Sequence, residues 1–191
     1  MKCAELVMQD HAVLRRGLDI VDAMLEKLEG GERIEIADVT SVLKFLRLFG
    51  DGYHQAMEET VLFPALLSAA DHDSPVTQFV SEHSDERMLV AEIEDALMSR
   101  RGMDFVRSSR RLTTLLRNHF DKEDALLCDL TERLLSQKQE DAVVAEFASN
   151  RTPPERYANL SRLEKKYGVK TSARPVIPGP SIPRDAAAFR T

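Results

Sequence analysis

The sequence has 191 residues, of which 43% are hydrophobic and 30% charged, and its formal net charge is -6. A chain of this length is expected to form one principal domain with a substantial core. The 26 basic residues are mixed with 32 acidic ones and form no basic stripe. Neither nucleic acid nor an anionic membrane is therefore an expected partner.

The N-terminal segment and the cysteines predict a cytoplasmic protein. Residues 1–10 contain no signal-peptide apolar run. No stretch approaches the roughly 20 apolar residues that cross a bilayer. The two isolated cysteines, Cys3 and Cys128, predict neither a disulfide framework nor a zinc site, and they fit a reducing compartment.

Apolar residues recur at spacings of three and four along most of the chain, which is typical of amphipathic helices. Gly30 and Gly31 are expected to end the first helix, and Pro75 lies in the first turn of the third. Pro64 lies inside the second helix, where its missing N–H predicts a kink. The four predicted helices cover about residues 4–29, 36–70, 75–100 and 103–137.

No run alternates with the period of two that marks a half-buried strand, so the predicted fold class is all-α. Short connections between long helices favour an up-down-up-down four-helix bundle, which is assigned to residues 1–148. A short helix is expected over about residues 142–147. Residues 149–191 are predicted as a C-terminal extension, with another short helix between Pro154 and Gly168 and then an extended Pro-rich tail.

Four of the five histidines fall one to each predicted helix. His11 lies about as many residues before the end of its helix as His54 lies after the start of the next. At a rise of 1.5 Å per residue, equal residue counts mean equal depths along the bundle. Antiparallel packing then brings the two to one level. The same comparison brings His83 level with His119, while His54 and His83 agree less well. The fifth histidine, His72, lies in an Asp-flanked turn and is expected to be solvated.

A glutamate follows two of these histidines at the fourth position, Glu58 after His54 and Glu123 after His119, so each pair shares a helix face. Imidazole and carboxylate suit iron, and two carboxylates are able to bridge a pair of metal ions. Manganese or a mixed pair of metals accepts the same ligand types. Ferritin-like sites use Glu-x-x-His motifs and only two histidines, so the count argues against that class.

These stretches resemble the hemerythrin-like (HHE cation-binding) family across about residues 4–137. The likeness is carried by Asp10-His11, His54-x-x-x-Glu58, Glu82-His83 and His119-x-x-x-Glu123. The resemblance implies a hemerythrin-like bundle around two iron ions that are bridged by an oxo or hydroxo group and by both carboxylates. It implies a ligand set of four histidines and two glutamates, namely His11, His54, Glu58, His83, His119 and Glu123.

The chain departs from the oxygen-carrying members of that family. Where their third helix carries a second histidine, this chain has Arg87, so reversible oxygen carriage is not expected. Their last carboxylate comes five positions after its histidine, which makes Asp124 a rival of Glu123. Glu59 and Glu86 neighbour the expected ligands, and we predict surface salt bridges for both and an exposed Arg87.

Two histidines per metal leave open positions for water, O2, peroxide or NO. The first hypothesis is therefore a protein that handles iron or small oxidants, in stress response or iron–sulfur cluster repair. Such a role requires an electron donor or an iron–sulfur protein as partner. The alternative is an iron or oxygen sensor without catalysis, because the same ligands serve both, and a metal-free interaction protein ranks below them. The sequence leaves the oligomeric state open.

Overall fold

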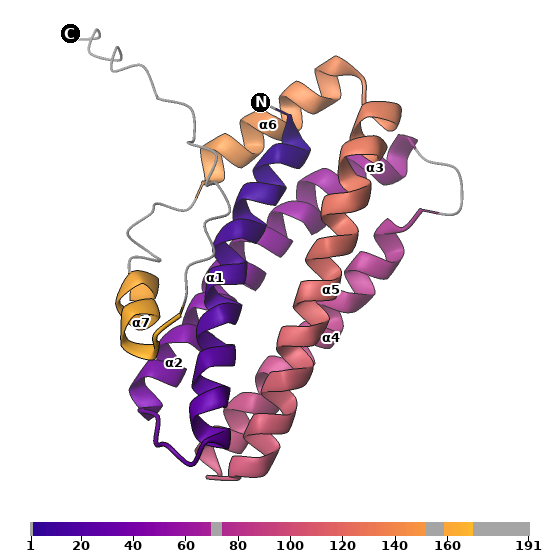
Figure 1. Ribbon diagram of the computed structural model, residues 1–191. Helices are drawn as coiled ribbons and strands as arrows, with labels where there is room; N and C mark the ends of the chain where they lie inside the picture. The colour runs from indigo at the N-terminus through magenta and orange to yellow at the C-terminus, as the bar shows by residue number, and fades with distance from the viewer. Residues whose placement is uncertain (1, 70–73, 152–158, 170–191) are drawn as a thin grey trace, which may run out of the picture.

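The computed structural model describes residues 2–69, 74–151 and 159–169, which form a bundle of four long antiparallel rods (Figure 1). None of these residues is in a strand, so the all-α prediction is confirmed. Three rods are single helices: α1 (Cys3–Glu29), α4 (Val76–Met98) and α5 (Gly102–Leu134). The other rod joins α2 (Ile36–Phe45), η1 (Leu46–Gln55), η2 (Glu58–Leu62) and α3 (Phe63–Ala69).

The second rod was predicted as one helix with a kink at Pro64, and its structure differs from that prediction. Its segments η1 and η2 are π-helical, with turns wider than those of an α-helix. In a regular helix the ring of Pro64 would meet the carbonyl of Thr60, and the wide turns of η2 lie directly before this proline. The distortion expected at Pro64 therefore takes the form of the wide turns of η2, whereas η1 begins well upstream of the proline, at Leu46.

Two glycines let the first two rods come together. Gly31 adopts a φ of 81°, a left-handed conformation that favours glycine, in the turn after α1. A Cβ atom at Gly17 would lie 2.6 Å from Cε1 of Phe45, so only glycine permits this close approach of α1 to α2. The core between the rods is apolar above and below one polar layer. On α1, for example, buried Val7 and Leu14 flank that layer.

Two further helices cover the outside of the bundle (Figure 1). The helix α6 (Gln137–Asn150) packs across one end, against α1 and η2. The helix α7 (Asn159–Tyr167) lies beside α1 and α2. The buried carboxylate of Asp38 on α2 accepts hydrogen bonds from Tyr167 Oη at 2.9 Å and from Arg162 at 3.0 Å. Both helices correspond to the short C-terminal helices that were predicted.

Some predictions concern other parts of the chain. His72 and the Pro-rich tail from residue 170 lie outside the described residues. The division at residue 148 stays a prediction. Within the described ranges, no helix combines the length and the apolar content that crossing a bilayer demands.

Candidate metal centre

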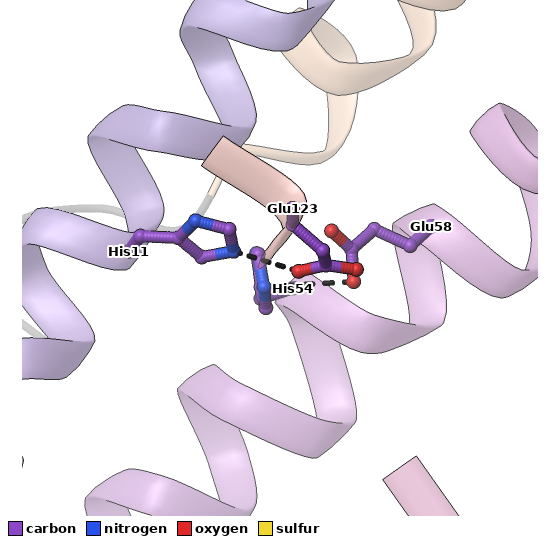
Figure 2. Close-up of side chains that lie close together, drawn as sticks. All are labelled: His11, His54, Glu58 and Glu123. Atoms are coloured by element: carbon purple, nitrogen blue, oxygen red, sulfur yellow. Dashed lines mark ion pairs between the residues drawn. The ribbon is translucent and has the colours of Figure 1, made fainter. Parts of the chain in front are cut away.

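The polar layer contains all six side chains that were predicted as metal ligands, here named the central cluster. They come from all four rods, and each residue is at most 1% exposed. Figure 2 shows four of them, His11, His54, Glu58 and Glu123, with their polar ends pointing toward one another. The remaining two, His83 on α4 and His119 on α5, complete the layer.

The two glutamates each connect histidines of different helices. Glu123 Oε2 lies 3.1 Å from Nε2 of both His11 and His119. Glu58 Oε2 lies 3.5 Å from Nε2 of both His54 and His83. Each carboxylate is thus positioned between two imidazoles.

The histidines themselves form two pairs. The ring centroids of His11 and His54 are 4.8 Å apart, as are those of His83 and His119. Each pair has a group of potential ligand atoms within 4.8 Å of one another, and Glu123 belongs to both groups. The first group is His11, His54, Glu58 and Glu123, and the second is His83, His119 and Glu123.

Most of the inward-facing atoms of the cluster are fully buried and lack a hydrogen-bond partner. They include both carboxylate oxygens of Glu58 and of Glu123 and the Nε2 atoms of His11 and His54. Buried polar atoms are nearly always paired in folded proteins, because leaving them unpaired is strongly destabilising. Carboxylate oxygens and imidazole nitrogens that converge in a buried layer fit a multivalent cation.

Carboxylates lie next to the outward-facing Nδ1 atoms of the four histidines. The Nδ1–oxygen distances are 2.7 Å for His11 with Asp124, 2.8 Å for His83 with Glu59, 2.9 Å for His119 with Glu82 and 3.8 Å for His54 with Asp10. The three short contacts are hydrogen bonds, which direct Nε2 of each ring into the cluster. Only the His54 contact is too long for a hydrogen bond.

Three of these outer carboxylates are in turn paired with cations. Arg15 lies 2.8 Å from Asp124, Arg87 lies 2.8 Å from Glu59, and Lys122 pairs with Glu82. The prediction of an exposed Arg87 is wrong in part, since the residue is half-buried. Glu59 forms the expected salt bridge, but it also contacts His83, which the sequence reasoning missed.

Glu86 is not on the surface, so the prediction of a surface salt bridge is wrong for this residue. It is 3% exposed, and its carboxylate accepts a hydrogen bond from Nε2 of buried Gln55. Burial raises the pKa of Glu86 to about 7. Its position three residues after His83 was the available signal, because residues at that spacing share a helix face.

The two glutamates of the cluster differ in the direction in which their pKa values are shifted. Burial alone raises the pKa of Glu123, but the contacts with its two histidines outweigh burial and hold the pKa below its ordinary value. Burial raises the pKa of Glu58 well above its ordinary value, and the charges of Glu123 and Asp10 raise it further.

The histidines follow the same division. Burial lowers the pKa values of His54 and of His83, that of His83 to about 4. Burial acts in the same direction on His11 and His119, but their carboxylate contacts outweigh it and raise both pKa values. The contacts of Glu123 with His11 and His119 thus shift the pKa values of all three residues toward their charged forms.

Phenylalanine rings cover the imidazoles. Phe120 stacks on His11 with ring centroids 4.4 Å apart, and Phe63 stacks on His83 at 5.9 Å. Each of these rings is at most 1% exposed, so the layer is shielded from water. Sequence reasoning did not single out these residues, although Phe120 directly follows His119.

Comparison with known proteins agrees with this geometry. The family model of the hemerythrin HHE cation-binding domain matches residues 4–130, which is more than half of the chain. No match was found among curated proteins or among solved structures. The match confirms the resemblance inferred from the histidine and glutamate motifs, and the chain belongs to the hemerythrin HHE cation-binding family.

Proposed function

We propose that this cation-binding domain holds two iron ions in the central cluster and handles iron or small oxidants. His11 and His54 would hold one ion, and His83 and His119 the other. Glu58 and Glu123 would help to hold them, because each carboxylate lies between histidines of the two pairs. Imidazole and carboxylate together suit iron, with manganese as the main competitor.

The observation that carries the proposal is the set of four buried carboxylate oxygens without hydrogen-bond partners. Among the described residues, no lysine or arginine forms an ion pair with Glu58 or Glu123. Two such anions are unstable together inside a protein unless a cation neutralises them. Two divalent ions would supply that charge and use all the inward-facing atoms.

The chain's own residues would prepare the ligands. Asp124, Glu59 and Glu82 accept hydrogen bonds from the Nδ1 atoms of their histidines, which fixes the tautomer that leaves Nε2 free. The phenylalanine rings keep bulk water away from the layer. When bound, a pair of iron ions supplies one-electron and two-electron chemistry toward O2, peroxide or NO. That reactivity fits oxidative or nitrosative stress, or iron–sulfur cluster repair.

Geometry favours Glu123 over its rival Asp124 as the ligand. Glu123 points inward and contacts two Nε2 atoms, whereas Asp124 contacts the outer Nδ1 of His11 and the guanidinium of Arg15. We therefore propose Asp124 as the residue that orients His11 and Glu123 as the residue that binds metal.

Metal content per chain tests the site. Protein from iron-supplemented cells should hold close to two irons, with near-ultraviolet absorption that bleaches on adding dithionite. The variant Glu123→Gln should lose iron, whereas Glu92→Gln on the exposed face of α4 should keep it. No uptake by the metal-free protein on anaerobic addition of Fe(II) would refute the site, and two manganese ions per chain would refute the choice of iron.

Reaction with oxidants tests the role separately. The reduced protein is mixed rapidly with hydrogen peroxide or with NO, and the change in absorption is followed. Fast reaction of the native chain, lost in Glu123→Gln, is the expected result. A two-iron protein that stays unchanged with peroxide, NO and O2 would refute the oxidant role while leaving the metal site intact.

A further inference from the structure

A second site of different chemistry lies at the end of the bundle away from α6. There the side chains line an open, largely apolar cavity of about 660 Å³, here named the end cavity. It is formed by the C-terminal end of α1, the start of α2, the end of α4 and the start of α5. Its apolar lining residues are Leu28, Ile34, Ile36, Val39, Ala96, Leu97, Met103, Phe105 and Val106.

The charged residues of the end cavity are all basic. Arg100 and Arg107 line it, and none of the described lining residues is acidic. Arg107 pairs with Asp104 at 2.7 Å, while Arg100 has no ion pair within the described part of the chain. The first turn of α5, which begins with lining residue Gly102, adds the partial positive charge of a helix N-terminus.

The turn after α4 places Arg100 beside the end cavity. Its φ of 54° is the left-handed conformation of a helix C-cap, in which the N–H of Arg100 donates to the carbonyl of Leu97 at 3.2 Å and the N–H of Arg101 donates to that of Ala96 at 2.8 Å. This turn puts Arg100 among the residues that line the cavity. Large apolar side chains beside it are exposed as well, with Ile36 61% and Met103 89% exposed.

We propose that the end cavity binds a single-chain amphiphile with an anionic head, such as a fatty-acid carboxylate. Its volume falls within the usual range for small-molecule sites, which are mainly apolar with a few polar groups. The acyl chain would lie among the aliphatic residues and cover Ile36 and Met103. The carboxylate would pair with Arg100 and Arg107.

Charge argues against two other occupants. Residues 170–191 contain four basic residues and one acidic residue, so the C-terminal segment has the same sign of charge as the two arginines. A second copy of the chain, placed here about a twofold axis, would bring arginines against arginines. An anion that carries an apolar chain satisfies both the lining and its charge.

Methionine methyl NMR tests the proposal, because Met103 lines the end cavity and Met98 does not, although Met98 is 85% exposed. Sodium decanoate, kept below its micelle concentration, should shift the Met103 signal saturably and leave that of Met98 in place. Hexanoate and decyltrimethylammonium should bind more weakly, since one lacks chain length and the other has the opposite charge. The result should be the same with and without bound metal.

Variants test the contributions of the ligand's carboxylate head and of its acyl chain separately. Arg100→Gln combined with Arg107→Gln should weaken decanoate binding about tenfold. Ile36→Asp should also weaken it, whereas Leu48→Asp, a matched change at a residue 56% exposed elsewhere, should not. Binding of the cationic amphiphile as tight as that of decanoate would overturn the proposal. So would an unshifted Met103, or a dimer in sedimentation that Ile36→Asp dissolves.

Discussion

The two glutamates of the central cluster occupy the same buried layer, yet their surroundings give them opposite properties. Glu123 lies 3.1 Å from two histidines, and its pKa is lowered. Glu58 lies 3.5 Å from two histidines, and its pKa is raised. The difference of a few tenths of an ångström accompanies a difference in charge, because the closer imidazoles carry the raised pKa values.

The comparison shows that the two halves of the layer differ in which forms of their side chains are favoured without metal. The contacts of Glu123 with His11 and His119 favour the charged forms of all three residues. Burial of Glu58, His54 and His83 favours their neutral forms, although a bound metal needs Glu58 as a carboxylate. Metal binding should therefore release protons, chiefly from Glu58, His11 and His119.

The largest expected effect distinguishes the two glutamates in metal-free protein. Glu123→Gln leaves two buried histidines without their counter-charge and should lower the free energy of unfolding by about 3 kcal/mol. Glu58→Gln removes a carboxyl whose neutral form is already favoured by burial, so it should cost much less stability. Urea unfolding of both variants at neutral pH, with metal removed by chelation, measures the difference. Equal destabilisation by the two changes would abolish the distinction drawn here.

Glu86 is a second buried residue whose carboxyl pKa is raised by burial, as that of Glu58 is. Its pKa is about 7 in the folded chain, against an ordinary 4.5. Because this pKa is raised on folding, the contribution of Glu86 to the free energy of unfolding is fully present below about pH 4.5 and is lost as pH rises through 7. Glu86→Gln should therefore stabilise the metal-free chain above pH 7, by an amount on the order of 3 kcal/mol, and have little effect below pH 4.5.

Unfolding of Glu86→Gln and the parent chain from pH 4 to 8 measures this change. Asp85→Asn, at the neighbouring exposed position of α4, is the matched control and should leave the pH profile unchanged. A Glu86→Gln curve parallel to that of the parent at every pH would contradict the raised pKa.

The smallest expected effect concerns Asp124 and Asp10, the carboxylates that lie next to the Nδ1 atoms of His11 and His54. Asp124 is hydrogen-bonded to His11 at 2.7 Å, whereas Asp10 lies 3.8 Å from His54. Asp124→Asn should therefore weaken iron binding by about 10- to 100-fold, as losses of such partners usually do. Asp10→Asn should change it much less. Competition with a chelator, monitored by absorption, measures both affinities, and a greater loss in Asp10→Asn would show that the His54 contact shortens when metal binds.

Much of the architecture could be predicted from the sequence, because the repeat of apolar residues, the residues that end helices and the spacing of the ligands are all local properties. The apolar stripes and Gly30-Gly31 predicted the rods, and His-x-x-x-Glu predicted which faces meet. The π turns of η1 and η2 could not be predicted, since they depend on how the second rod packs against its neighbours. The burial of Glu86 was missed for a simpler reason, namely that a spacing of three was not treated as a shared face.

The outer contacts of the cluster were also beyond sequence reasoning. Glu59 and Glu82 are each adjacent in sequence to a predicted ligand, but their partners His83 and His119 lie on other helices. Only the packed bundle brings these side chains together. The cysteine count and the charge balance, by contrast, are properties of the sequence alone, and the expectations that rest on them need no contact between helices.

The docking of α6 and α7 has a consequence for how this domain is delimited. The family match ends at residue 130, yet Phe147, Leu160 and Leu163 are at most 2% exposed and pack into the same core. The buried Asp38 receives its hydrogen bonds from α7. The unit of homology is thus shorter than the unit of folding, and a fragment cut at the homology boundary would expose an apolar flank that the whole chain keeps covered.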